Sequence, residues 1–232
     1  MTQSRRNFLT KLGVGALALG AGATQEGYAS EEVAQEFTPD EALEMLKKGN
    51  QEFLAGNVNP EAASAMRRLE IASGQKPFAI LVGCSDSRVS PEILFGRRLG
   101  ELFIVRNAGN VVDLAALGSI EYGVLELAIP LIIVLGHEKC GAVEAAVSIV
   151  EENTEFPGSI GLMVAPILPA VLAMREEPGD LLDNAVRENV RRIVERLSNS
   201  EDVLTEPLEA GRLKIVGARY DLDSGEVDFS VA

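Results

Sequence analysis

The segment of residues 131–142, with the sequence LIIVLGHEKCGA, constrains the fold of this chain more than any other. It begins with five apolar residues, which is typical of a strand buried on both faces of a parallel sheet. The chain then turns at Gly136 and presents His137 and Cys140 three residues apart, at the start of a stretch rich in Ala and Val that is typical of a helix. The segment therefore predicts a core strand followed by two residues of metal-binding type.

A second stretch repeats this design earlier in the chain. Residues 78–83, FAILVG, form another apolar run that leads directly into Cys84. Parallel strands end at one edge of a sheet, where open α/β folds bind their ligands, so we expect Cys84 to lie near His137 and Cys140. Two Cys and one His are a known catalytic zinc set, with the fourth tetrahedral position left for water. The sequence therefore predicts one zinc ion per chain at this edge.

The rest of the chain alternates strands with helices, which predicts an α/β fold with a mainly parallel central sheet flanked by helices. A hairpin that turns at residues 221–225 is expected at the C-terminal edge of the sheet. Residues 157–173 are apolar but interrupted by Pro166 and Pro169, so their structure stays open. Further strands are predicted at residues 102–106, 213–218 and 227–231. Helices are predicted at residues 38–56, 60–71, 114–128, 140–151 and 183–197, with a short one starting at Ser90.

The N-terminal residues have the pattern of an export signal. Arg5 and Arg6 form a twin-arginine motif, and residues 14–23 are a short apolar core. This core cannot span a bilayer, which takes about 20 residues, and small residues suitable for cleavage follow it. Cleavage is expected after Ala23 or Ala29, of which we favour Ala29; the alternative is a frayed basic N-terminus. We therefore predict a signal peptide at residues 1–29, a single domain at residues 30–232, and a periplasmic or otherwise exported protein without stable membrane insertion.

The charge of the chain argues against nucleic acid as a partner. The formal net charge is −14, and removal of residues 1–29, which hold three basic residues and one acidic residue, makes it −16. So acidic a domain repels phosphate backbones, and the sequence has no basic stripe that would offset this repulsion.

The two cysteines allow a second interpretation. In an exported protein they would ordinarily predict one disulfide. The twin-arginine route, however, carries chains that fold before export, so zinc can be bound where thiols are reduced. From the residues alone, the disulfide and the zinc site both stay open.

Asp86 and Arg88 follow Cys84 at the end of the first predicted strand. Because they are two residues apart, both side chains can reach one pocket; the alternative is a local salt bridge that only braces the loop. His137 is the only histidine of the chain. Its position three residues before one of only two cysteines favours a ligand over a structural residue.

The motif C-S-D-S-R at residues 84–88, followed by G-H-x-x-C-G at residues 136–141, resembles the β-class carbonic anhydrase family. The similarity continues through residues 100–110 and 118–122 and ends in the turn at residues 220–225, so it covers nearly all of the mature chain. The resemblance implies the β-carbonic anhydrase fold. It also implies reversible hydration of CO2 to bicarbonate and a proton by attack of zinc-bound hydroxide.

Position by position, the resemblance assigns roles to individual residues. It makes Asp86 and Arg88 an active-site dyad, in which Asp86 orients the nucleophile and Arg88 holds Asp86 away from the metal. The backbone N–H of Gly141, at the start of a helix, is suitably placed to receive a developing negative oxygen. The implied zinc ligands are Cys84, His137 and Cys140.

The resemblance also implies a substrate site shared between subunits. Gln75, nine residues before Cys84, and the aromatic residues Phe103 and Tyr122 match substrate-binding positions that reach across a dimer interface, so a homodimer or homotetramer is expected. Some family members have a closed form, in which the Asp binds zinc and bicarbonate is held in a site lined by Trp. Others keep the site open and use the Gln at the position of Gln75. This chain has that Gln and no Trp, which favours the open form. The rival functions are a COS or CS2 hydrolase on the same fold and a non-catalytic structural zinc protein.

Overall fold

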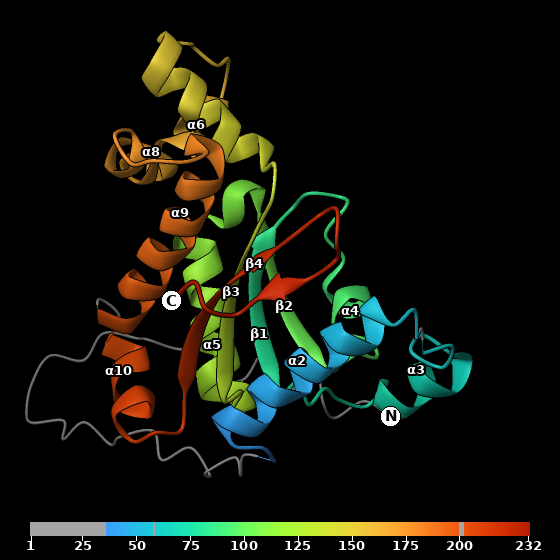
Figure 1. Cartoon of the computed structure of the whole chain (residues 1–232). Helices are drawn as coiled ribbons and strands as arrows, with labels where there is room; N and C mark the ends of the chain where they lie inside the picture. The colour runs from blue at the N-terminus through green and yellow to red at the C-terminus, as the bar shows by residue number, and fades with distance from the viewer. Residues whose placement is uncertain (1–35, 58, 200–201) are drawn as a thin grey trace, which may run out of the picture. The chain divides into compact units, whose positions relative to one another are not determined.

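The computed structural model describes residues 36–57, 59–199 and 202–232, so the predicted signal peptide lies outside the described residues. At its centre is a five-stranded sheet with the strand order β2-β1-β3-β4-β5 (Figure 1). All neighbouring strands are parallel except β4 and β5, which form the predicted C-terminal hairpin. The strands are β1 (Ala79–Cys84), β2 (Leu102–Asn107), β3 (Leu131–His137), β4 (Lys214–Tyr220) and β5 (Val227–Asp228).

Helices cover both faces of the central strands. Side chains alternate along a strand, so Leu81 and Ile133 pack with α2 and α4 on one face, whereas Ile80 and Ile132 pack with α5, α9 and α10 on the other. Every residue of β1 and β3 is buried, which explains why both strands are continuous apolar runs. The helices are α2 (Pro39–Leu54), α4 (Pro91–Leu94), α5 (Leu114–Leu127), α6 (Gly141–Glu152), α9 (Leu181–Asn199) and α10 (Asp202–Glu209).

Capping residues fix the beginning of two predicted helices. At α2, the Thr38 side chain accepts a hydrogen bond from the backbone N–H of Glu41, and the Glu41 carboxylate accepts one from the backbone N–H of Thr38. At α5, the Asp113 carboxylate accepts a hydrogen bond from the backbone N–H of Ala116. Each cap satisfies helix-terminal N–H groups that have no partner within the helix. Both predicted starts are therefore confirmed.

The structure differs from the prediction in three places. The helix expected at residues 60–71 is the shorter α3 (Ala65–Ile71), because Ser64 caps it by accepting a hydrogen bond from the backbone N–H of Arg67. Helix α10 was not predicted, and it contains Pro207. Strand β5 has two residues, fewer than the predicted 227–231.

Residues 157–173, left open by the sequence, form three short helical elements. Pro166 and Pro169 lie in the first turns of the second and third of these. A proline there removes an N–H group that has no helical partner in any case, so it begins a helix without breaking one. The elements are α7 (Ile160–Val164), η2 (Ala165–Ile167) and α8 (Leu168–Met174).

A third group of buried residues closes the carboxyl end of the sheet. Cys84 and Cys140 belong to it together with Val143 of α6, Val171 of α8 and Val186 of α9. Helices α6 and α8 lie beyond the carboxyl ends of the strands (Figure 1). Both thiols therefore lie in an apolar setting at the predicted edge. In the part of the chain that the structure describes, no helix combines the length and the hydropathy needed to cross a membrane.

Candidate metal centre

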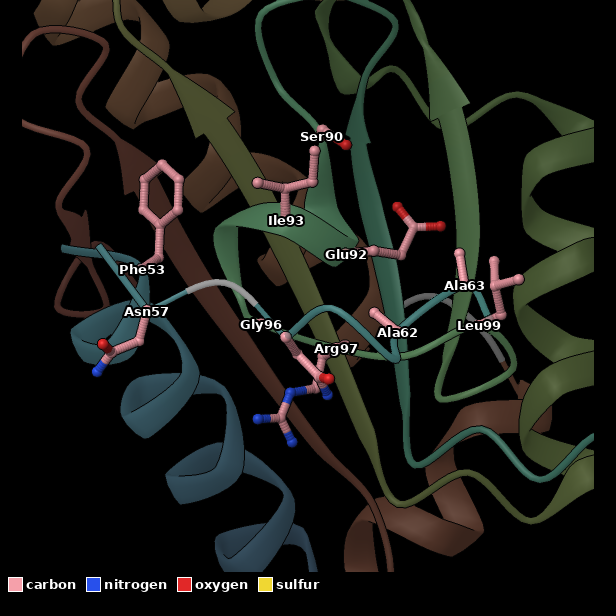
Figure 2. A pocket seen from close by; sticks show the side chains of 11 residues that line it. Phe53, Asn57, Ala62, Ala63, Ser90, Glu92, Ile93, Gly96, Arg97 and Leu99 are labelled. Atoms are coloured by element: carbon pink, nitrogen blue, oxygen red, sulfur yellow. The ribbon is translucent and has the colours of Figure 1, made fainter. Parts of the chain in front are cut away.

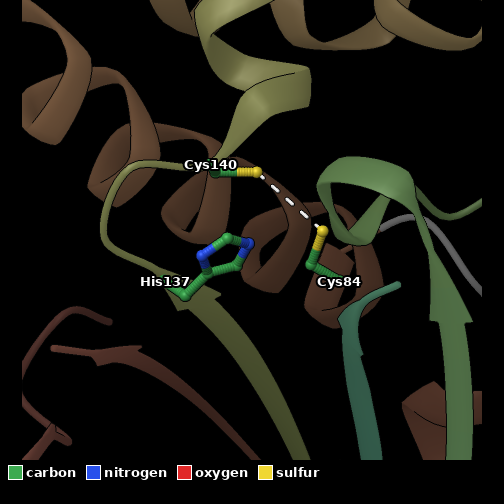
Figure 3. A group of neighbouring side chains, drawn as sticks. All are labelled: Cys84, His137 and Cys140. Atoms are coloured by element: carbon green, nitrogen blue, oxygen red, sulfur yellow. Dashed lines mark hydrogen bonds between the residues drawn. The ribbon is translucent and has the colours of Figure 1, made fainter. Parts of the chain in front are cut away.

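The structure brings the three predicted zinc ligands together at the carboxyl edge of the sheet (Figure 3). Cys84 is the last residue of β1, His137 is the last residue of the neighbouring β3, and Cys140 immediately precedes α6. Their candidate ligand atoms all lie within 4.8 Å of one another, and all three residues are buried. In the described ranges, no other group of three such residues converges in this way.

The two sulfur atoms are spaced for a metal and not for a disulfide. They lie 3.9 Å apart, and both cysteines are free. A disulfide would bring them to about 2.05 Å. Two Zn–S bonds of about 2.3 Å at a tetrahedral angle would separate the sulfurs by about 3.8 Å. The sulfur separation therefore fits zinc, and the structure does not contain the alternative disulfide.

The imidazole of His137 is oriented for coordination. Its Nδ1 lies 2.8 Å from the backbone oxygen of Glu138, and because a carbonyl oxygen only accepts, Nδ1 must carry the proton. Its Nε2 is buried and has no hydrogen-bond partner among the described residues. A buried nitrogen lone pair without a partner is costly unless a cation binds it. The donor set of two thiols and this Nε2 therefore fits zinc.

The two thiols affect each other's protonation in the absence of a cation. The hydrogen bond from Cys140 lowers the pKa of Cys84, against the opposing effect of burial, and the same bond together with burial raises the pKa of Cys140. Hence only one of the two sulfurs is readily a thiolate. A divalent cation would stabilise the thiolate form of both, since metal ligands bind deprotonated.

Asp86 and Arg88 form a bidentate ion pair beside the ligands. Arg88 Nε donates to Asp86 Oδ1 at 2.9 Å and Arg88 Nη2 donates to Asp86 Oδ2 at 2.7 Å. Asp86 Oδ2 also lies 3.8 Å from Nε2 of His137. The guanidinium holds the pKa of Asp86 well below its usual range, although partial burial acts in the opposite direction. The pair both braces the loop and places an ionised carboxylate at the centre.

Arg106 was not predicted as a site residue, although it lies within the segment that resembles the family. From the edge strand β2 its guanidinium donates to three backbone oxygens, of Cys84 at 2.8 Å, Asp86 at 2.7 Å and Val89 at 2.9 Å. These bonds fix the loop that carries the first ligand and the dyad. The sequence contains no signal for this role, because 22 positions separate Arg106 from Cys84.

A second unpredicted contact reaches Cys84 from Gly109. The backbone N–H of Gly109 donates to Cys84 Sγ at 3.2 Å, and Asn189 of α9 holds the Gly109 oxygen at 3.0 Å. Gly109 has a φ of 68°, and an added Cβ would lie 2.6 Å from Ile167 and 3.0 Å from Ala142. Only glycine fits this conformation and this space. The bond to sulfur is of the kind that stabilises a thiolate.

Three predicted substrate-binding residues lie away from the metal ligands within one chain. Gln75 precedes the amino end of β1, whereas Cys84 ends this strand, which rises ~3.3 Å per residue. Phe103 pairs with Ile80 in the amino half of the sheet. The rings of Phe103 and Tyr122 lie 6.3 Å apart, and Tyr122 is 48% exposed. A single chain therefore does not bring these three residues to the centre.

Gly141, in contrast, lies next to the metal ligands in sequence and in the fold. It is the first residue of α6 and directly follows the ligand Cys140. A Cβ added to Gly141 would meet no atom within 4 Å, so the space beside its backbone is open. As the first residue of α6, Gly141 lies at the positive end of the helix dipole.

A separate pocket of about 330 Å³ lies between the end of α2, the segment before α3 and helix α4 (Figure 2). Its lining includes Phe53, Ser90 and Ile93. None of the metal ligands, and neither member of the dyad, lines this pocket. It is therefore distinct from the candidate metal centre.

Comparison with known proteins agrees with the chemistry of the centre. The family model described as carbonic anhydrase matches residues 79–227, which include the ligands and the dyad. The chain belongs to the carbonic anhydrase family. Carbonic anhydrase 2 of Mycobacterium tuberculosis is 42% identical to it over 187 residues, which are 81% of this chain and 90% of the relative.

Solved β-carbonic anhydrases share the fold. The Coccomyxa β-carbonic anhydrase in complex with acetazolamide is 28% identical, with a TM-score of 0.63 over 81% of this chain and 84% of that one. A tetrameric β-carbonic anhydrase of Sordaria macrospora is 25% identical, with a TM-score of 0.64 over 69% of this chain and 83% of that one. This carbonic anhydrase is therefore of the β class, an enzyme whose cofactor is zinc.

Proposed function

We propose that this chain catalyses the reversible hydration of CO2 to bicarbonate and a proton, with one zinc per chain held by Cys84, His137 and Cys140. The observation that carries the proposal is the convergence of these three buried ligand atoms within 4.8 Å in a member of the carbonic anhydrase family. When bound, zinc supplies a hydroxide nucleophile near neutral pH by lowering the pKa of water.

Asp86 orients the nucleophile. Its pKa lies well below the usual range because of Arg88, so at neutral pH the carboxylate is ionised and only accepts hydrogen bonds. A hydroxyl that donates to Asp86 has its lone pair directed elsewhere, toward the carbon of CO2. Arg88 holds both carboxylate oxygens and also donates to the Lys139 oxygen at 3.2 Å. This arrangement supports the open form, in which Asp86 is bound to Arg88 and not to the metal.

The backbone N–H of Gly141 stabilises the oxygen on which negative charge develops as bicarbonate forms. The first N–H groups of a helix have no partner within the helix and lie at its positive end. No atom would lie within 4 Å of a Cβ added to Gly141, so side chains do not crowd this backbone position. A preorganised backbone donor of this kind needs no rearrangement during the reaction.

The remaining substrate contacts come from a second copy of the chain. Gln75, Phe103 and Tyr122 lie away from their own chain's ligands, and Tyr122 is half exposed, as expected for residues that complete a neighbouring site. The similar enzyme of Sordaria macrospora is tetrameric. We therefore propose a homodimer or homotetramer in which each subunit supplies Gln75 to its partner.

Replacing Gln75 by alanine is expected to lower kcat/KM about ten-fold, equivalent to ~1.4 kcal/mol, because one hydrogen bond to the substrate is lost. Gln51→Ala, an exposed glutamine on α2, serves as the matched control and should have wild-type activity. Hybrids of Gln75→Ala with Cys140→Ser subunits should regain wild-type kcat/KM per zinc, since the second subunit supplies an intact Gln75. Hybrids without this recovery would contradict a role across the interface.

Proton release is expected to depend on external buffer. His137 is the only histidine of the chain. It is fully buried, and its Nδ1 donates a hydrogen bond to the backbone oxygen of Glu138. No second imidazole is therefore available to carry protons near neutral pH. At fixed pH, kcat should rise with buffer concentration while kcat/KM changes little, as measured by stopped flow. A kcat that does not respond to buffer would refute this argument.

The substrate is tested by comparing CO2 hydration with hydrolysis of COS and CS2 by the same zinc-loaded protein. The proposal predicts that kcat/KM is highest for CO2. A preference for COS or CS2 would assign the same site to the alternative hydrolase function. Full zinc occupancy without turnover of any of the three would leave a structural zinc protein.

The proposal includes export by the twin-arginine route, supported by Arg5 and Arg6 before the apolar residues 14–23. The double substitution Arg5→Lys and Arg6→Lys should abolish accumulation of the full chain in the periplasm, because the route requires the arginine pair. Lys11→Arg, which leaves the pair intact, is the control. Unchanged accumulation of the double variant in cell fractions would contradict a periplasmic location.

A further inference from the structure

We infer that Glu138 is a positioning residue for the zinc ligand His137. It acts by tying the ligand loop, residues 138–140 between β3 and α6, to the C-terminal turn at residues 220–225. The inference rests on the zinc site of the proposed function. It assigns a role to a residue that touches neither the substrate nor the metal.

All three polar groups of Glu138 are used. Its backbone N–H donates to the Tyr220 oxygen at 2.9 Å, and its carboxylate Oε2 accepts from the backbone N–H of Leu222 at 3.2 Å. Its backbone oxygen accepts from Nδ1 of His137 at 2.8 Å. Two of the bonds therefore attach Glu138 to the C-terminal turn. The third fixes the orientation of the His137 imidazole relative to Glu138.

The C-terminal turn is itself a firm support. The buried side chain of Asn50 on α2 donates to the Gly225 oxygen at 3.0 Å and accepts from the backbone N–H of Val227 at 3.0 Å. Within the turn, Asp221 Oδ1 accepts from the backbone N–H and the hydroxyl of Ser224, both at 2.9 Å. The turn is thus held both by α2 and by its own side chains, so it can fix the ligand loop.

The ligand loop needs such support because it contains an unfavourable backbone conformation. Lys139, directly after Glu138, has a φ of 51°, in the left-handed region that favours glycine. Its side chain is 54% exposed and pairs with Glu138 and Asp223, which is 80% exposed. Exposed pairs of this kind contribute little. The bond from Leu222 to the Glu138 carboxylate is the better anchored of the side-chain links between the loop and the turn.

The outer partner of a metal-bound histidine fixes its tautomer and its ring orientation, and loss of such a partner typically weakens metal binding by about 10–100-fold. Here that partner is the backbone oxygen of Glu138. If the Glu138 side chain loses its anchor at Leu222, the peptide that carries this oxygen can rotate. Nδ1 of His137 then loses its acceptor, and Nε2 is no longer held toward the two sulfurs.

The test uses three variants of the full chain. Glu138→Ala removes the acceptor for the Leu222 N–H. Glu138→Gln keeps an acceptor oxygen and removes only the charge. Asp223→Asn is the matched control, because it weakens the other side-chain link between the two loops without affecting Glu138.

Zinc affinity is measured by competition with a chelator, and the His137 Nδ1–H signal is followed by NMR after 15N-histidine labelling. The single histidine of the chain gives a single imidazole, so the signal needs no assignment. Glu138→Ala should bind zinc about 10–100-fold more weakly and exchange its Nδ1 proton with solvent faster. Glu138→Gln and Asp223→Asn should resemble the wild type in both measurements.

Wild-type zinc affinity and an unchanged Nδ1–H signal in Glu138→Ala would overturn the inference. So would a Glu138→Gln variant as impaired as Glu138→Ala, since charge and not the anchor would then be responsible. If Glu138→Ala does not fold, Glu138→Asp, whose shorter side chain cannot reach Leu222, replaces it with the same expected loss. Failure of the wild type itself to bind zinc would instead refute the proposed function, so the two failures are distinguishable.

Discussion

Replacing Cys140 by serine is expected to abolish zinc binding and CO2 hydration together. The substitution removes one of only two thiolate ligands. Loss of a hydrogen-bond partner of a metal ligand already weakens metal binding by up to ~100-fold, so loss of the ligand itself should weaken zinc binding further. A 100-fold loss of affinity at saturating zinc removes about 2.7 kcal/mol of stability. Metal analysis, stopped-flow hydration and thermal unfolding of the same preparation measure the three effects.

Val143→Ala is the matched control for this experiment. Val143 lies three residues after Cys140, on α6, and is 1% exposed, so its truncation should cost about 2 kcal/mol of stability through a cavity. It should nevertheless retain one zinc per chain. If Cys140→Ser kept its zinc and its activity, or if Val143→Ala lost zinc to the same extent, the loss could not be attributed to a missing ligand.

The second large effect is expected for Asp86→Asn. Kcat/KM should fall by about 10²–10³-fold, the usual cost of removing one oriented polar group from an active site, while the zinc content stays at one per chain. The amide presents N–H donors where the nucleophile needs an acceptor, and it loses one of the two charge-assisted bonds to Arg88. Stopped-flow hydration at matched zinc content checks the prediction.

Asp180→Asn is a suitable control for the Asp86 variant. Asp180 Oδ1 accepts a hydrogen bond from the backbone N–H of Asp183 at the start of α9, and asparagine caps helices about as well as aspartate. Its kcat/KM should therefore match that of the wild type. A fully active Asp86→Asn protein would mean that the ion pair with Arg88 only braces the loop.

The features that local sequence predicts well are those determined by local physics. The apolar runs of β1 and β3 predicted buried parallel strands because both faces of these strands are covered. Thr38 and Asp113 marked the starts of α2 and α5 through caps made within three residues. The ligands also followed from the sequence, since the ends of neighbouring parallel strands must meet at one edge.

What the sequence did not predict depends on distant contacts. Arg106 reaches the loop after β1, Asn189 holds the Gly109 oxygen, and Glu138 reaches the C-terminal turn, each over a separation of 17 positions or more. No local pattern encodes such pairs. The helical elements between residues 157 and 173 were missed for a different reason, because Pro166 breaks a helix interior but suits a first turn.

The most direct test of the central claim is a zinc titration of the metal-free full chain, followed by the rate of CO2 hydration. Activity should rise in proportion to added zinc and reach a plateau at one equivalent per chain, and the Cys140→Ser protein should show no rise. Full activity of the metal-free protein, or zinc bound at one equivalent without any CO2 hydration, would contradict the central claim.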